Sequence, residues 1–259
     1  MKKIRIGITV VGKDREGVVA AFTNLIFQKQ GNIEKINQNV MKELFGMHLE
    51  ASFSKEIDVK KFDKELQDLG SQLGMEVSVY HEINSEKNIA IFVTKEPHCL
   101  DALISAKSQL KGTINVIVGT EKTLESIAKK AGIPFVLVDE KDQQKAEDHL
   151  IDVTKKYDVD LVVLARYMRI MTPNFVWRYP HRIINIHPSL LPAFPGAFAY
   201  AQAYERGAKI IGVTAHYVTE ELDQGPIIFQ DSFKVDSSDT LETIKKKGQE
   251  LEEIGRAHV

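Results

Sequence analysis

The first third of the chain alternates between hydrophobic patterns of period two and patterns of helical period. Stretches in which every second residue is apolar predict half-buried strands, and apolar residues spaced three and four apart predict amphipathic helices. The predicted elements in chain order are a strand at 3–11, a helix at 18–30, strands at 33–41 and 47–53 around Gly46, a helix at 59–73 and a strand at 76–83. This βαββαβ order predicts a ferredoxin-like domain over residues 1–83.

A short polar break, residues 84–87, separates this domain from a second pattern. Beyond the break, runs of apolar residues alternate with helical patterns, which is typical of buried parallel strands connected by helices. The predicted strands are 89–93, 114–118, 135–138, 160–164, 182–187 and 210–218, and the predicted helices are 100–108, 124–130 and 145–157. We therefore expect an α/β protein whose second, Rossmann-like domain at 88–259 holds a mostly parallel sheet with helices on both faces.

The composition narrows the classes of function. The 259 residues are 43% hydrophobic and 27% charged, which suffices for a sizeable core, and a net charge of −2 argues against nucleic-acid partners. A single cysteine, Cys99, excludes an internal disulfide framework and cannot by itself build a zinc site. No run of about 18 apolar residues marks a membrane helix. We expect a small-molecule partner and a reducing, cytoplasmic compartment.

Candidate acid–base residues cluster where a predicted strand ends. Asn185 and His187 are two apart on the strand at 182–187, so their side chains should point to the same side of the sheet. Asp223 follows the strand at 210–218 and could supply a carboxylate to the imidazole. Ligands of open α/β sheets bind at the carboxyl ends of the strands. On residue types alone, however, purely structural roles are favoured, in which the histidine ends a strand and the aspartate forms an Asp-x-Gly turn.

Four segments carry a resemblance to a known fold family. They are LARYMRIMTPNFV from Leu164, NIHPSLLP from Asn185, PGAFAYAQAYERG from Pro195 and GVTAHYVTEELDQGPII from Gly212. In this order they closely resemble the formyltetrahydrofolate-dependent formyltransferases. The resemblance implies that Asn185, His187 and Asp223 form a catalytic trio.

The same resemblance implies a pocket for the pterin ring of 10-formyltetrahydrofolate. Backbone groups around Arg169 and Met171 would meet the ring, and a loop ending at Asp223 would close over it. The positions implied for folate binding are Leu164, Arg169, Ile170, Met171, His216, Val218, Glu220, Glu221 and Leu222. The alternative is ordinary core for the aliphatic residues and His216, and a solvated face for the Arg169 side chain.

The segment KDREG from Lys13, followed by VVAAFTNLI and GNIEKINQ, resembles the ACT domain, a regulatory module that often binds an amino acid between subunits. The resemblance implies an effector site at Asp14 and Gly17 with Asn32 as a second contact, and a homo-oligomer. Glycine and methionine are the candidate effectors because both connect to one-carbon metabolism. The alternative is that Asp14 caps the following helix and Gly17 lets the chain enter it, without a ligand.

Residues 95–100, KEPHCL, form the first strand-to-helix turn of the second domain, where Rossmann-like proteins hold phosphate on glycine amides. The turn has no glycine, Glu96 would repel a phosphate, and we expect His98 and Cys99 to pack against the helix or cap it. Glycinamide ribonucleotide formyltransferases carry a glycine-rich loop here. The turn instead resembles that of the formyltetrahydrofolate deformylases, which also carry an N-terminal ACT domain. The resemblance implies a hydrolase that uses water as the acceptor and needs no metal or permanently bound cofactor.

Two departures from the deformylase pattern leave other acceptors open. Deformylases commonly have a second histidine where Pro188 stands and a Pro-Tyr pair at the positions of Ala199 and Tyr200. Formyl transfer to an amine such as glycinamide ribonucleotide is the first alternative. A non-catalytic, ACT-controlled folate binder is the second.

The end of the chain has an unusual sequence. Residues 254–259, IGRAHV, match the translation of a common sequencing adapter in one reading frame, and members of the family continue further. We expect a truncated gene end after about Glu253.

Overall fold

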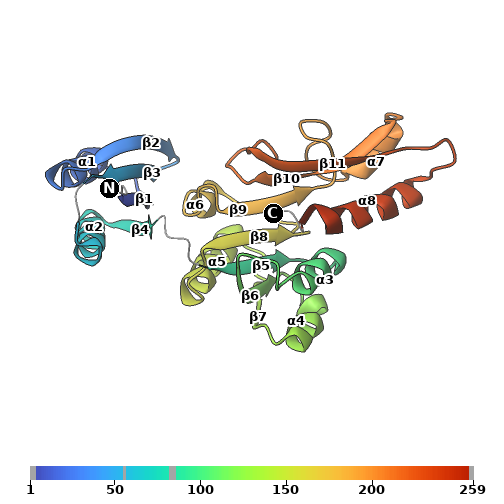
Figure 1. Ribbon diagram of the computed structural model, residues 1–259, viewed down its shortest axis with the longest axis horizontal. Coiled ribbons are helices and arrows are strands. Elements are labelled where there is room, and N and C mark those ends of the chain that lie inside the picture. Colours follow the sequence, from blue (N-terminus) through green and yellow to red (C-terminus); the bar gives the residue numbers. More distant parts are fainter. Residues whose placement is uncertain (1–3, 55–56, 82–85, 257–259) are drawn as a thin grey trace. The chain divides into compact units, whose positions relative to one another are not determined.

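The computed structural model describes residues 4–54, 57–81 and 86–256. The protein forms two compact units (Figure 1), one of Met1–Asn84 with Pro173–Pro180 and one of Ser85–Thr172 with His181–Val259. The expected domain boundaries at residues 83 and 88 stay a prediction. Among the helices of the described residues, none is both long and apolar enough to cross a membrane.

The first unit is an antiparallel sheet with two helices. Its elements are β1 (Ile4–Lys13), α1 (Val18–Gln28), β2 (Asn32–Met41), β3 (Leu44–Phe53), α2 (Val59–Leu73) and β4 (Met75–His81), with the strands in the order β2-β3-β1-β4. Ile6, Ile8 and Val10 alternate along β1 and pack with Phe22 and Ile26 of α1. The ferredoxin-like βαββαβ order predicted from the sequence is confirmed.

The turn between β2 and β3 lies at Lys42 and Glu43, and the expectation of strands on either side of Gly46 was wrong. Both turn residues have left-handed backbone, with φ of 47° and 62°. Gly46 lies inside β3, where a Cβ would come within 2.4 Å of the Trp177 ring. Glycine at this position therefore allows close packing of an aromatic ring, and an isolated glycine in a sequence does not distinguish that role from a turn.

Residues 173–180 belong to the first unit although they lie in the middle of the second in sequence. The segment begins with α6 (Pro173–Val176), and Arg178 donates to the Glu76 carboxylate of β4 at 3.1 Å. The Tyr80 hydroxyl also donates to the backbone carbonyl of Arg178 at 3.4 Å. Helical spacing predicts which face of a segment is buried but not the element that covers it, so the sequence could not assign this segment.

The second unit is built on a sheet in the order β11-β10-β9-β8-β5-β6-β7 (Figure 1). Strands β9, β8, β5, β6 and β7 run parallel, and β10 and β11 run antiparallel at one end. The strands are β5 (Lys87–Val93), β6 (Gly112–Gly119), β7 (Phe135–Leu137), β8 (Leu161–Ala165), β9 (Ile183–His187), β10 (Ile210–Tyr217) and β11 (Ile227–Lys234). The helices are α3 (His98–Ser105), the 3₁₀ turn η1 (Lys122–Leu124), α4 (Glu125–Ala131), α5 (Gln143–Lys156), α7 (Ala199–Glu205) and α8 (Leu241–Arg256). The predicted mostly parallel sheet is confirmed.

The strand order creates a crevice beside β5. The chain proceeds from β5 to β6 and β7 on one side, and later to β8 and β9 on the other. Ligands of open α/β sheets bind outside the carboxyl ends of the strands at such a reversal. β5 itself is buried on both faces, with Ala90 to Val93 at 0% exposure, which explains its uninterrupted apolar sequence.

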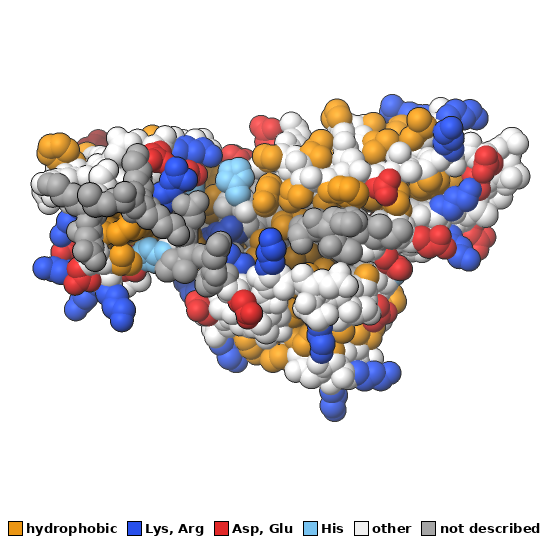
Figure 2. Space-filling model, viewed as in Figure 1, with side chains coloured by type: hydrophobic (Ala, Val, Ile, Leu, Met, Phe, Trp, Pro, Cys, Tyr) orange, Lys and Arg blue, Asp and Glu red, His pale blue; other side chains and the backbone are white. Residues whose placement is uncertain are grey.

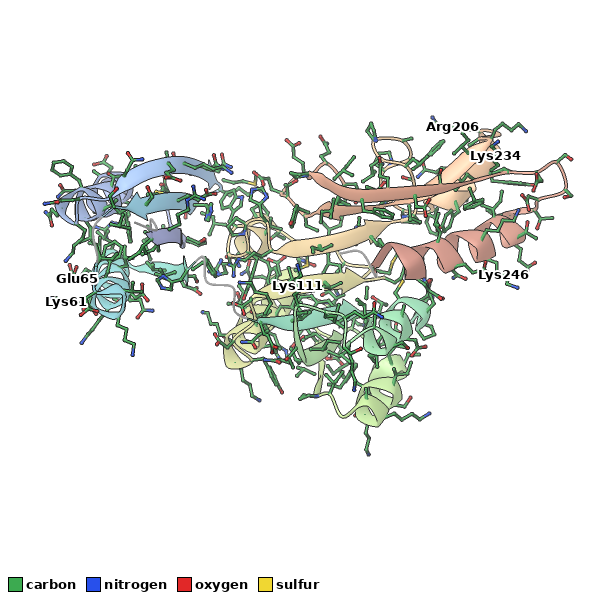
Figure 3. All side chains as sticks on the ribbon, viewed as in Figure 1. Lys61, Glu65, Lys111, Arg206, Lys234 and Lys246 are labelled. Atoms are coloured by element: carbon green, nitrogen blue, oxygen red, sulfur yellow. The ribbon has the colours of Figure 1, made fainter. Side chains whose placement is uncertain are left out.

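The antiparallel end of the sheet keeps some apolar surface exposed. Ile210 of β10 and Ile227 of β11 are 54% and 49% exposed, and Figure 2 shows apolar surface in this part of the unit. On α8, Ile244 is buried whereas Lys246 is exposed, and Figure 3 shows Lys246 pointing away from the sheet. α8 therefore has one face toward the protein and one toward solvent.

Candidate active site

The end of β9 carries two of the residues expected to act on the substrate. Pairing of β9 with β10 places Asn185 opposite His216, and His187 is the last residue of β9. Asp223 lies in the loop after β10 and has left-handed backbone, with φ of 56°. His187 Nδ1 is 3.3 Å from Asp223 Oδ2, and the two side chains are 5% and 6% exposed. The structure thus brings the predicted trio together in a nearly buried site.

Both ring nitrogens of His187 face oxygen acceptors. Nε2 donates to the backbone carbonyl of Phe194 at 2.9 Å, and Nδ1 faces the Asp223 carboxylate. Nε2 carries a hydrogen, so Nδ1 of a neutral ring would be an acceptor facing a carboxylate, which is also an acceptor. A proton shared between Nδ1 and the carboxylate turns this contact into a hydrogen bond. This arrangement suits an imidazolium paired with a carboxylate, which can hold and move a proton near a reacting group.

His216 orients the Asn185 amide. His216 Nδ1 donates to the carbonyl of Tyr217 at 2.9 Å, so Nε2 of the neutral ring is an acceptor. Asn185 Nδ2 lies 3.3 Å from that Nε2 and donates to it. Burial lowers the pKa of His216, against the opposing effects of the Tyr217 hydrogen bond and the Asp223 charge, and this keeps the ring neutral. The second N–H of Asn185 is then left for a substrate.

Asp223 also holds the loop that follows β9. Its Oδ2 accepts from the backbone N–H of Gly196 at 2.7 Å. Gly196 has φ of 81°, a conformation that glycine adopts without steric cost. Asp223 Oδ1 lies 3.8 Å from His216 Nε2. One carboxylate therefore holds His187 and the loop and places its negative charge near His216, a role that the sequence did not reveal.

A cavity of about 780 Å³ lies at the carboxyl ends of β5, β8 and β9. Ile170 and Leu222 at its wall are 66% and 50% exposed, and exposed apolar side chains around a cavity favour a ligand with apolar surface. Glu221 does not line it, although its neighbours Glu220 and Leu222 do. The lining includes the trio and the expected folate positions Leu164, Arg169, Ile170, Met171, His216, Val218, Glu220 and Leu222.

A buried carboxylate on α5 holds one wall of this cavity. Glu147 is 1% exposed and accepts from the backbone N–H of Thr172 at 2.7 Å and from its hydroxyl. Gln143 donates to Glu147 at 3.1 Å and to the carbonyl of Ile170 at 3.0 Å. Sequence reasoning missed this residue. The available signal was a glutamate on the apolar stripe of α5, three residues before the buried Leu150.

A second buried carboxylate lies at the first strand-to-helix turn. Glu252 of α8 is 0% exposed and accepts from His98 Nε2 at 3.1 Å and from Cys99 Sγ at 3.5 Å. Cys99, in α3, packs in the core, as expected, whereas His98 does not cap the helix, which follows Pro97 without a side-chain cap. The three side chains have ligand atoms within 4.8 Å of one another, close enough for a metal ion. Arg166 Nε lies 4.0 Å from Glu252, however, and a guanidinium there disfavours a second cation.

The expected effector positions lie in the first unit. Gly17, with φ of 85°, occupies the N-cap of α1 without a side-chain cap, so the alternative of Asp14 as the capping residue is wrong. Asp14 instead donates its backbone N–H to the carbonyl of Glu43 at 2.7 Å. Asn32 begins β2 and pairs with Ser52. Within the described residues no hydrogen bond joins the Asn32 side chain to the Asp14–Gly17 turn, and an effector site there stays a prediction.

Family models match both units. Residues 5–80 match the model of the ACT domain, and residues 87–259 match that of the formyl transferases. A formyltetrahydrofolate deformylase of Escherichia coli O6:H1 (strain CFT073) is 42% identical over 248 residues, which cover 92% of this chain and 86% of the relative.

Solved structures show the same relationship. The crystal structure of a formyltetrahydrofolate deformylase from Pseudomonas syringae pv. tomato is 31% identical with a TM-score of 0.65, and the match covers 99% of this chain and 89% of that one. The crystal structure of a phosphoribosylglycinamide formyltransferase from Bacillus halodurans is 36% identical with a TM-score of 0.63. That match covers only 66% of this chain, although it covers 92% of the formyltransferase. Because the deformylases match over both units, the chain belongs to the formyltetrahydrofolate deformylase family.

Proposed function

We propose that the protein hydrolyses 10-formyltetrahydrofolate to formate and tetrahydrofolate, with Asn185, His187 and Asp223 acting on the formyl group. The observation that carries this proposal is the pairing of His187 with Asp223 at 3.3 Å in the wall of the cavity. The deformylase relatives that match most of the chain support the choice of reaction.

The chemistry follows from the donors and acceptors of the site. The oxygen of water attacks the formyl carbon, and the carbonyl oxygen becomes an oxyanion that needs hydrogen-bond donors. The second N–H of Asn185 is one donor, because His216 holds the amide in orientation. The His187 imidazolium is the other donor, and its Nε2–H moves from the Phe194 carbonyl to the oxyanion.

Proton transfer completes the reaction. Asp223 accepts a proton from the attacking water and stabilises the imidazolium of His187. The oxyanion then re-forms the carbonyl as the bond between the formyl carbon and N10 breaks, and N10 takes the proton that Asp223 had accepted from water. The formic acid that results loses its hydroxyl proton to solvent as formate. Formate and tetrahydrofolate are the products, so one water is consumed for each formyl group released.

The substrate would place its pterin ring against the loop after β8. Met168 and Ile170 are 60% and 66% exposed there, and a flat heterocycle would cover them. Backbone groups of Arg169 and Met171 would supply hydrogen bonds to the ring, and the loop with Glu220 and Leu222 would close over it. Glu221 is left out of this proposal because it does not line the cavity.

The first unit would regulate the enzyme. The match to the ACT domain supports an amino-acid effector, which we place at the Asp14–Gly17 turn, with glycine and methionine as candidates. We also propose a homo-oligomer, since the resemblance implies a site shared between subunits.

An assay of acceptor use tests the proposed reaction. The protein is incubated with 10-formyltetrahydrofolate, with and without glycinamide ribonucleotide, while formate and tetrahydrofolate are measured. Hydrolysis predicts equal amounts of both products at a rate that the amine does not change. Formylated ribonucleotide would instead establish a transferase, and binding without turnover would establish a folate binder.

A further inference from the structure

An ion pair occupies the turn where the crevice of the second unit meets α3. Arg166, which follows β8, donates to Glu96 through Nε at 2.9 Å and through Nη2 at 3.2 Å. Both residues line the cavity that contains the trio, and the Glu96 side chain is 32% exposed. A bidentate arginine–carboxylate pair is among the stronger polar contacts in proteins.

Glu252 of α8 fixes this pair from the protein side. Its carboxylate accepts from the Tyr200 hydroxyl at 2.8 Å and from His98 at 3.1 Å, and lies 4.0 Å from Arg166 Nε. Burial alone would raise the pKa of Glu252, but the His98 hydrogen bond and the Arg166 charge lower it, so the carboxylate is ionised. Arg166 therefore lies between two carboxylates, those of Glu96 and Glu252.

This arrangement is the reverse of a phosphate site. Phosphate sites at such a turn use free backbone N–H groups and a positive side chain. Here Pro97 has no N–H, and the guanidinium of Arg166 is committed to Glu96. A phosphate that reached Arg166 would have to displace two charge-assisted hydrogen bonds and would then lie near Glu96 and Glu252.

We propose that the Glu96–Arg166 ion pair, held by Glu252, excludes phosphate-bearing acceptors from the cavity and thereby selects water. This inference rests on the proposed hydrolysis. In this proposal Glu96 does more than repel a phosphate through its negative charge. It also occupies Arg166, the side chain that would otherwise bind the phosphate. Removing Glu96 should therefore create a phosphate site, whereas removing another cavity carboxylate should not.

Glu121 offers the matched control. It also lines the cavity, and its carboxylate accepts from the Thr123 hydroxyl at 3.3 Å rather than from Arg166. We would measure formate release from 10-formyltetrahydrofolate by the full chain, Glu96→Ala and Glu121→Ala over a range of inorganic phosphate, each relative to its own rate without phosphate. Glycinamide ribonucleotide is the second probe. Glu96→Gln, which keeps the packing, replaces Glu96→Ala if the latter does not fold.

The expected result is that Glu96→Ala is inhibited by both probes at concentrations about tenfold or more below those needed for the parent and Glu121→Ala. Equal inhibition of all three proteins by phosphate would overturn the proposal while leaving the hydrolase intact. Stronger inhibition of both variants would also overturn it, since net charge alone would then explain the effect. A parent that releases no formate, or that formylates the amine, would contradict the proposed function itself.

Discussion

His187 and Asp223 face each other with Nδ1 3.3 Å from Oδ2, although one residue ends β9 and the other follows β10. The carboxylate also accepts from Gly196, and the imidazole also donates to Phe194. Each group is thereby fixed by a second contact as well as by its partner. Such fixed geometry is what an acid–base pair requires, because displacing a catalytic group by about 1 Å can cost 10² in rate.

Removing the imidazole should affect turnover more than binding. We expect His187→Ala to lower kcat by about 10² or more and to change KM by no more than a few fold, since the group acts mainly on the transition state. Steady-state formate release measures both constants. Lys246→Ala, on the exposed face of α8 (Figure 3), is the control and should match the parent. A His187→Ala variant with the parent's kcat would remove this residue from the mechanism.

The Glu147 carboxylate should matter for folate binding. Glu147→Ala leaves the backbone N–H of Thr172 without its acceptor and removes one of the two acceptors of the Gln143 amide, so we expect a loss of about 1 to 3 kcal/mol in the free energy of unfolding. We also expect KM for the folate to rise several fold, because the loop that contains Ile170 loses its attachment to α5 at Thr172. Denaturant unfolding and steady-state kinetics give the two values.

Asp148→Ala is the matched control for that change, because its carboxylate accepts from Gln144 on the exposed side of the same helix. It should leave both quantities close to those of the parent. If the two variants behave alike, the buried contacts of Glu147 do not hold the loop.

Lowering the pH should decrease the free energy of unfolding partly through His216. Burial lowers the pKa of this histidine in the folded state, so the unfolded chain binds a proton first as the pH falls. Its contribution to stability is complete above the unfolded pKa of about 6.5 and is lost as the pH falls from there toward the lower folded value. We expect His216→Asn to show a smaller decrease in unfolding free energy between pH 7.5 and 5.5 than the parent. An equal or larger decrease would show that His216 does not carry this dependence.

The effector site can be tested at Gly17. A Cβ at this position would have no atom within 4 Å, so a substitution does not crowd the turn. The cost comes instead from the backbone φ of 85°, and we expect Gly17→Ala to lose about 1 kcal/mol of stability. Glycine and methionine are titrated against formate release in the parent and in this variant. If neither amino acid changes the parent's activity or assembly at millimolar concentration, the unit has no effector role for them.

Relationships within one strand were predictable, whereas relationships between distant segments were not. Asn185 and His187 belong to one strand, so period-two geometry alone places them on one side of the sheet. The contact of Asn185 with His216 depends on the register of β9 against β10, which the apolar pattern does not specify. The partnership of Arg166 with Glu252 is more remote still, since α8 must first pack beside the turn at the start of α3.

Close packing was the other limit of sequence reasoning. Gly46 has the spacing of a turn glycine, but it makes room for Trp177, and no local pattern records which ring approaches it. The sequence does show Glu147 as a charged residue on the apolar face of α5, but it does not indicate that Thr172 is its partner. Folding brings such pairs together through tertiary packing, which hydrophobic periodicity does not encode.

Hydrolysis in water enriched in ¹⁸O tests the central claim most directly. The parent is mixed with 10-formyltetrahydrofolate in labelled water, and the mass of the released formate is measured together with tetrahydrofolate. Attack by water predicts one labelled oxygen in each formate and one formate for each tetrahydrofolate, with Asp223→Asn slower by about 10² or more. Tetrahydrofolate that forms without labelled formate, or an Asp223→Asn variant that proceeds at the parent's rate, would contradict the assignment of water as the acceptor and of Asp223 as its base.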